Sequence, residues 1–419
     1  MPNPLAIGFW RQPRTKHTLQ STSSPSARTQ AVTAFGIDKA NMFTFWDWVA
    51  PPPRFRDATQ AYITPLGSQQ EFELGCFLRD TYLNPHSPSF IQNISTDVVN
   101  IDQLAVRADA GGGNVILDSA YALLQGLYPP TYKSEMILAN GQTALPPLGG
   151  YQYVPVQSLE FWQAPSLTSW MDCEYFQFHL ARVYTASAFT NMSVAAEPFL
   201  TALKPYLGSV NNNLTNIWNI YDHVNVQYTH NKTYYETLPA TFLEQARYYA
   251  NWVQNNVFTD TVQNGVGQIA IRTLFPEIFW ALGNMTQPSN QVKISIQEVD
   301  YKPFISLFNV TNATVADPDI AGIVDYASVV AFELSQNSQG QHEVSMKFKN
   351  GTQDSEFRQL KMFGNTSITL DSFIHQLDWT TINSTINWCF SCNQTVLRGC
   401  SVFNYSADPF LHPGTTTNA

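Results

Sequence analysis

The stretch from Val98 to Pro130 constrains the fold of this chain more than any other part of the sequence. The pattern of apolar residues predicts a β-strand at Val98–Val106. A glycine-rich segment, RADAGGGN (residues 107–114), follows it. The next pattern predicts a helix at Leu117–Leu127 that ends before Pro129-Pro130. A strand, a glycine loop and a helix N-terminus together present backbone N–H groups to an anion. A tight turn that needs glycine only for steric reasons fits the same residues. We therefore expect an α/β unit with either an anion site or a plain turn at residues 107–114.

Composition narrows the class of protein. Of the 419 residues, 44% are hydrophobic and only 13% are charged, and the net charge is −10. Nucleic-acid binding needs clustered Lys and Arg, which this acidic chain lacks. No apolar run is long enough to cross a bilayer. We expect a globular protein that binds no nucleic acid, has no membrane span, and needs neither a metal nor a cofactor.

Sequons and cysteines indicate a secreted, extracellular glycoprotein that carries N-linked glycans. Three cysteines, Cys389, Cys392 and Cys400, cluster near the C-terminus and predict at least one disulfide, with Cys76 and Cys173 as further candidates. Cys389 and Cys392 also form a CxxC pair typical of zinc sites, but no second CxxC or paired histidine follows. The N-x-S/T sequons begin at Asn93, Asn191, Asn213, Asn231, Asn284, Asn309, Asn312, Asn350, Asn365, Asn383, Asn393 and Asn404.

The first thirty residues do not fit a secreted protein, because they lack the apolar segment and cleavage site of a signal peptide. We interpret residues 1–30 as an unstructured or non-native N-terminus. Periodicity then divides the rest into an α/β domain, 31–130 and 288–419, and a mainly helical insertion domain, 131–287. In the second α/β segment we predict a strand at Val292–Ile296, helices at Pro303–Val310, Gly322–Leu334 and Leu370–Leu377, and a strand at His342–Phe348.

Four stretches resemble the histidine acid phosphatase family, and in particular its secreted fungal branch of acid phosphatases and phytases. They are ITPLGSQQ with LRDTY (residues 63–70 and 78–82), SAYALLQGLYPP (119–130), DYASVVAFEL (325–334) and HEVSMKF (342–348). The resemblance implies a three-layer αβα sandwich of the phosphoglycerate-mutase-like type with a helical insertion. It also implies hydrolysis of phosphomonoesters.

The chemistry of that family depends on residues that this chain lacks. Its RHGxRxP motif supplies a histidine nucleophile and two arginines, and a later His-Asp pair supplies the acid for the leaving group. The nearest match to the first motif is Arg11-Gln12-Pro13-Arg14-Thr15, without histidine, and Asp300-Tyr301 stand where His-Asp is expected. The third phosphate-binding arginine is also displaced, since Asn114 and Val115 occupy its neighbourhood and Arg107 comes earlier.

The remaining candidate ligands allow two interpretations each. Asp300 and Lys302 either supply a proton and a phosphate contact or belong to a solvated loop. Arg107 and Asp109 either bind an anion beside Asn114 or form a structural ion pair. Either the N-terminus is truncated or the lineage has lost catalysis.

We therefore assign no catalytic residue and expect little or no phosphatase activity. The alternative function is a non-catalytic pseudophosphatase that binds a small phosphorylated molecule or another anion. A weaker third possibility is a hydrolase that uses Asp109 or Asp300.

Overall fold

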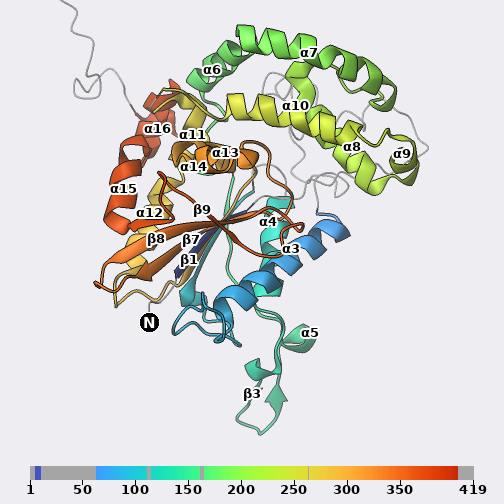
Figure 1. The fold of residues 1–419 in the computed structure, drawn as a ribbon. Helices are drawn as coiled ribbons and strands as arrows, with labels where there is room; N and C mark the ends of the chain where they lie inside the picture. Colours follow the sequence, from blue (N-terminus) through green and yellow to red (C-terminus); the bar gives the residue numbers. More distant parts are fainter. Residues whose placement is uncertain (1–4, 11–62, 111–114, 161–164, 263, 404–419) are drawn as a thin grey trace, which may run out of the picture.

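A mixed β-sheet forms the centre of the protein (Figure 1). The structure is a computed structural model that describes residues 5–10, 63–110, 115–160, 165–262 and 264–403. Its strand order is β10-β8-β7-β1-β6-β2-β5, with β9 paired to β8. The strands β1, β6, β2 and β5 run parallel, whereas β7 to β10 pair antiparallel. Their bounds are β1 Leu5–Trp10, β2 Leu104–Asp109, β5 Gln157–Leu159, β6 Ile294–Glu298, β7 Val329–Gln336, β8 His342–Lys349, β9 Arg358–Leu360 and β10 Ser367–Thr369.

Helices cover both faces of this sheet, as Figure 1 shows. On one face lie α3 (Pro65–Leu78) and α4 (Val115–Leu127), and α4 contacts β2 and β6. On the other lie α12 (Phe275–Met285), which contacts β1, and α15 (Leu370–Leu377), which contacts β8. The αβα sandwich predicted from the sequence is confirmed.

A helical layer stands beyond one end of the sheet (Figure 1). Its helices are α6 Glu174–Thr185, α7 Ser187–Leu203, α8 Ile217–His230, α9 Lys232–Thr237 and α10 Phe242–Val257. The sheet itself also takes a strand from the segment 131–287, because β5 pairs with β2. The remaining described elements are β3 Met136–Ile137, β4 Thr143–Ala144, α5 Pro147–Gly150, α11 Ile269–Arg272, α13 Lys302–Val310, α14 Ala313–Ala316 and α16 Thr385–Cys392.

The expectation that residues 1–30 are unstructured is wrong for Leu5–Trp10. This segment is β1, which lies in the middle of the sheet, parallel to β6 and antiparallel to β7. Its sequence, LAIGFW, is a continuous apolar run and lacks the alternation that identifies a half-exposed strand. The rest of the 1–30 segment lies outside the described residues.

Two further element predictions need correction. Val329–Gln336 is strand β7 and not part of a helix spanning Gly322–Leu334. Six of its eight residues are buried, and periodicity cannot separate such a run from a buried helix. The strand predicted at Val98–Val106 lies later, at Leu104–Asp109, so Arg107 and Asp109 belong to β2 and not to the glycine turn.

The cysteine cluster forms two disulfides, Cys173–Cys392 and Cys389–Cys400. Each cysteine of the CxxC pair therefore has its own disulfide partner, and Cys76 is a free thiol. The first disulfide links the start of α6 to α16 across 219 residues of chain. In the part of the chain that the structure describes, no helix is long and apolar enough to cross a membrane.

Two glycines let α3 and α4 approach backbone to backbone. A Cβ on Gly75 would meet Leu123 O and come within 2.8 Å of Leu127 N, and a Cβ on Gly126 would come within 2.8 Å of Cys76 N. Backbone atoms cannot swing away as a flexible side chain can, so this crossing requires glycine at both positions. The helix pair in turn fixes which α3 side chains face the sheet.

We predict that Gly75→Ala lowers the free energy of unfolding by about 1–3 kcal/mol, because the helices must separate. Gly283→Ala is the matched control, since Gly283 also lies in a helix but has open space around its Cβ position. The control is expected to stabilise the protein by about 0.5–1 kcal/mol. Urea unfolding of both variants measures the difference, and equal effects would contradict the tight crossing.

Candidate functional site at the carboxyl ends of the parallel strands

The carboxyl ends of β1, β6 and β2 meet at one edge of the sheet. Trp10 and Ala108 are the register partners of Glu298, so the three strands end side by side. In open α/β sheets, ligands bind outside the carboxyl ends of parallel strands. We therefore take this edge as the candidate site, and the residues after Glu298 are its central part.

Asp300 and Lys302 follow β6 directly and form an ion pair. The Lys302 backbone N–H also donates to Asp300 Oδ1 at 2.9 Å. Both side chains are almost completely buried, and Lys302 Nζ lies 5.1 Å from the ring centroid of Trp170 and 4.7 Å from that of Tyr301. Tyr301 is itself held, because its hydroxyl donates to Gln254 Oε1 at 2.7 Å. The interpretation of this segment as a solvated loop is wrong.

Arg107 is held away from Asp300 and Lys302 by other partners. Its guanidinium forms an ion pair with Glu277 of α12 at 3.1 Å and donates to Gln297 Oε1 at 3.2 Å and to Ser166 Oγ at 3.0 Å. Burial lowers the pKa of Arg107, and the nearby Glu277 carboxylate partly opposes this. Arg107 thus has a structural ion pair with Glu277, a partner that differs from the Asp109 considered from the sequence.

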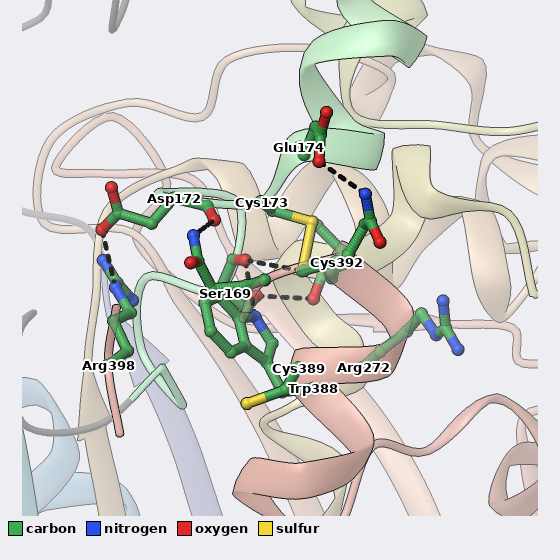
Figure 2. The surroundings of a disulfide bond; sticks show 12 residues. Ser169, Asp172, Cys173, Glu174, Arg272, Trp388, Cys389, Cys392 and Arg398 are labelled. Carbon is green, nitrogen blue, oxygen red and sulfur yellow. Dashed lines mark hydrogen bonds and ion pairs between the residues drawn. A yellow bond between two sulfur atoms is a disulfide. The ribbon is translucent and has the colours of Figure 1, made fainter. Parts of the chain in front are cut away.

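The C-terminal segment brings a second arginine toward the same edge (Figure 2). Arg398 donates from Nε to Asp172 Oδ2 at 2.9 Å and from Nη1 to Thr168 O at 3.0 Å. Burial lowers the pKa of Arg398, while Asp172 and, more weakly, Asp109 at the end of β2 oppose this. Arg398 was not among the residues predicted from the sequence, although its position between Cys392 and Cys400 marked it as part of a disulfide-bonded segment.

The disulfide-bonded segment is fixed by further contacts around Arg398 (Figure 2). Trp388 Nε1 donates to Ser169 O at 2.9 Å, and Gln394 Nε2 donates to Asp172 O at 2.7 Å. These bonds join α16 and the tail to the loop before α6.

The last of the site residues predicted from the sequence, Asn114, lies outside the described residues.

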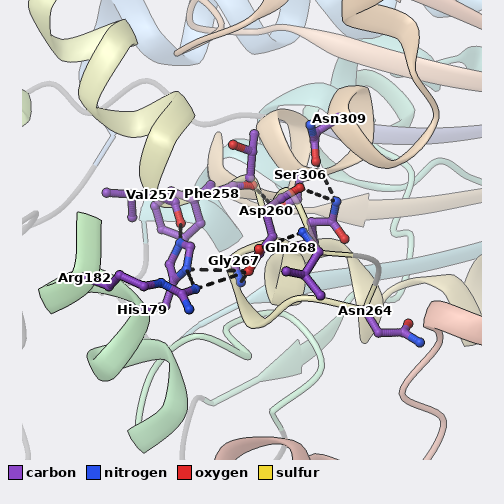
Figure 3. A network of polar contacts seen from close by, with 12 residues as sticks. His179, Arg182, Val257, Phe258, Asp260, Asn264, Gly267, Gln268, Ser306 and Asn309 are labelled. Atoms are coloured by element: carbon purple, nitrogen blue, oxygen red, sulfur yellow. Dashed lines mark hydrogen bonds and ion pairs between the residues drawn. The ribbon is translucent and has the colours of Figure 1, made fainter. Parts of the chain in front are cut away.

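A histidine–carboxylate pair lies in the helical layer, but its contacts are structural (Figure 3). His179 of α6 is buried, with Nε2 3.1 Å from Val257 O and Nδ1 3.5 Å from Asp260 Oδ2. Arg182 Nη2 lies 3.0 Å from the same Nδ1, and Gly267 N donates to Asp260 Oδ2. Burial lowers the pKa of His179. Both ring nitrogens have protein partners, so this histidine does not replace the missing nucleophile.

Two fully buried glutamates were also missed. Glu298 ends β6, and Glu71 lies on the buried side of α3. A signal was present in both cases, because each acid interrupts a pattern of otherwise buried positions. In α3 the spacing Gly67, Glu71, Leu74, Leu78 places Glu71 in the buried stripe.

Comparison with solved structures identifies this architecture. No family model matches the sequence. The chain is similar to the apo form of the phytase from Hafnia alvei, with a TM-score of 0.59 and 12% identity, covering 91% of this chain and 97% of that one. It is also similar to the phytase of Klebsiella sp. ASR1, with a TM-score of 0.58 and 10% identity, covering 93% and 99%.

The fold is that of the histidine acid phosphatase-type phytases. A yeast relative, the phytase from D. castellii, matches with a TM-score of 0.50 and 10% identity over 93% of this chain and 81% of that one. At these identities the likeness concerns the fold. The phytase-like fold therefore agrees with the fold that the sequence resemblance implied.

We predict that Lys302→Met destabilises the protein by on the order of 3 kcal/mol, because it leaves Asp300 buried without its cation. The double variant Asp300→Asn/Lys302→Met should cost less than that single change, since no charge is stranded. Urea unfolding of the wild type, the two single variants and the double variant completes the cycle. Additive effects of the two single changes would contradict a coupled buried pair.

Proposed function

We propose that this chain is a secreted glycoprotein of phytase-like fold that does not turn over phosphomonoesters, that is, a pseudophosphatase. The observation that carries the proposal is the Asp300–Lys302 pair at the end of β6. Phosphoryl transfer needs cations whose charge is directed at the substrate and an acid that can give up a proton. Here the lysine is neutralised by the acid beside it, both side chains are largely buried, and Lys302 Nζ lies over the rings of Trp170 and Tyr301.

The other described cations at this edge support the same conclusion. Arg107 is paired with Glu277 and Arg398 with Asp172. None of the described histidines directly follows the end of a parallel strand in the sequence. The segment Arg11 to Thr15, the nearest match to the nucleophile motif, lies outside the described residues.

The sequence left open an alternative function, which is binding of an anion without hydrolysis. This alternative depends on two cations, Lys302 and Arg398. Lys302 and Arg398 place positive charge near the carboxyl ends of β6 and β2, where a phosphorylated ligand would bind. Such an anion has to compete with Asp300 and Asp172 for them. We therefore expect weak anion binding in the wild type and stronger binding once a competing carboxylate is removed.

We predict that the purified chain hydrolyses a generic phosphomonoester at acidic pH only at background level. The deficit relative to an active histidine acid phosphatase assayed in parallel should exceed about 10⁴-fold, because the whole catalytic unit is missing. Arg107→Ala and Asp300→Asn should leave this background unchanged. Turnover that falls in either variant would show a relocated catalytic set and overturn the proposal.

A binding arm of the same experiment separates the two non-catalytic functions. Titration of inorganic phosphate into wild type and Asp300→Asn by calorimetry should show roughly tenfold tighter binding to the variant if Lys302 faces the ligand. Equal, undetectable binding by both proteins would exclude anion binding through Lys302 and leave the pseudophosphatase proposal in place.

Glycosylation and secretion are supported by the exposure of the sequons. Of the eleven sequon asparagines among the described residues, none is buried. Two of the partly exposed ones are engaged, since Asn309 Oδ1 accepts from Gln268 Nε2 and Asn350 Oδ1 caps Asp325 N. The two disulfides also fit an oxidising compartment.

We predict that expression through the secretory pathway of a eukaryotic cell gives N-glycans on exposed sequons such as Asn93, Asn191 and Asn365. Asn309 and Asn350 should remain largely unmodified, because their side-chain oxygens already cap or bridge other segments. Mass spectrometry of peptides before and after enzymatic deglycosylation measures the occupancy of each site. A protein without any glycan on the exposed sequons would argue against the secreted form.

A further inference from the structure

The two buried glutamates lie on the same side of the sheet, Glu71 on α3 and Glu298 at the end of β6. Gln297 contacts Arg107 on the α12 side of the sheet, and adjacent strand residues point to opposite faces, so Glu298 points toward α3 and α4. Glu71 stands on the buried side of α3. Both side chains are fully buried, and none of their four carboxyl oxygens has a hydrogen-bond partner among the residues that the structure describes.

A charge in such a place carries a large free-energy penalty unless it is neutralised. Burial raises the pKa of Glu71 well above its usual range, and the Glu298 carboxyl raises it further. Burial also raises the pKa of Glu298 well above its usual range. The two acids therefore favour their protonated forms in the folded protein.

No described cation is positioned to neutralise the carboxylates of Glu71 and Glu298. On α3 and the turn after it, Arg79 donates to Leu127 O. On the same face of the sheet, Glu333 of β7 is shared between the Tyr82 hydroxyl and Lys347 of β8. Lys349 of β8 donates to Gly351 O.

The remaining titratable groups on the elements packed around the pair are acids or are engaged elsewhere. On α4, Asp118 accepts a hydrogen bond from the backbone of Ile63. On β6, Asp300 binds Lys302 beyond the strand end. The segment of β1 has no titratable residue, and Ala108 is the β2 partner of Glu298.

A bound metal ion fits this place poorly. Calcium takes six to eight oxygen ligands and magnesium about six, in near-ideal geometry. Two carboxylates offer four oxygens, and within the described ranges no three His, Cys, Asp or Glu side chains form a metal-binding group. A proton needs only the two carboxyl groups themselves, because one O–H can donate to the oxygen of the other.

We propose that Glu71 and Glu298 form a proton-sharing carboxyl pair that locks α3 onto β6 at acidic pH and weakens this contact as the pH rises. The pair forms a pH-sensitive switch within the core of the fold. Its position matters for the candidate site, because Glu298 is only two residues from Asp300. A looser contact between α3 and β6 would therefore also change the position of the segment that carries the Asp300–Lys302 pair.

The direction of the effect follows from proton linkage. An unfolded chain releases both protons near pH 4.3, the usual glutamate value, whereas the folded chain keeps them to higher pH. The folded state is therefore favoured most below about pH 4.3 and loses this advantage as pH rises toward the folded pKa values. Within that window, each retained proton changes the ratio of folded to unfolded protein by up to about tenfold per pH unit.

The test compares urea unfolding of the full chain from acidic to neutral pH in wild type and Glu71→Gln/Glu298→Gln. Glutamine keeps the shape of the protonated acid and cannot ionise. The ratio of folded to unfolded variant, relative to wild type, should rise about tenfold or more per pH unit through the window. The control Glu244→Gln, at an exposed helical position, should track the wild type. Parallel curves for wild type and the double variant would overturn the proposal.

Two further measurements keep the proposal testable if the double variant does not fold. Infrared spectra of the folded wild type at neutral pH should contain the carbonyl stretch of a protonated carboxylic acid, which is lost on unfolding and reduced in Glu298→Gln. A spectrum without that band would reject the shared proton.

Calcium chloride added at neutral pH should not stabilise the wild type. If it did so, and left Glu298→Gln unaffected, the pair would hold a cation and not a proton.

Discussion

The cost of burying charge without a partner controls how this protein is built around the carboxyl ends of its parallel strands. Lys302 is matched by Asp300, Arg107 by Glu277, and Arg398 by Asp172. Each pair removes the penalty that an isolated buried charge would carry. A phosphate-processing site requires the opposite arrangement, because its cations must keep their charge available for the substrate. The three ion pairs at this edge therefore engage the charge of Lys302, Arg107 and Arg398 within the protein itself.

Most of the architecture could be predicted from the sequence, and the errors share one physical origin. Periodicity located β8 and α15 closely, since the predicted ranges His342–Phe348 and Leu370–Leu377 almost coincide with the observed elements. The strand β7 was missed because the run that forms it is almost entirely buried. Without an exposed face there is no alternation, so a short apolar run gives no sign of its conformation.

The site was less predictable, because its contacts join segments that are distant in the sequence. The sequence identified Asp300 and Lys302 through their place in the family pattern, but not the pairing that neutralises them. For Arg107 it offered an ion pair with Asp109 as one of two interpretations, whereas the described partner is Glu277, 170 residues away along the chain. Arg398 reaches the edge only because two disulfides and the Trp388–Ser169 bond fix the tail against the loop before α6. No local pattern reports such contacts.

Strand β6 connects the two faces of the phytase-like fold to the candidate site. Gln297 faces α12 and binds Arg107, while Glu298 faces α3 and Glu71. Asp300 then holds Lys302 just past the strand end. Because successive residues of a strand point to opposite faces, one short segment joins both helical layers and the candidate site. If Asp300 gave up its contact with Lys302, the lysine would lose its partner. These polar contacts therefore stabilise the fold.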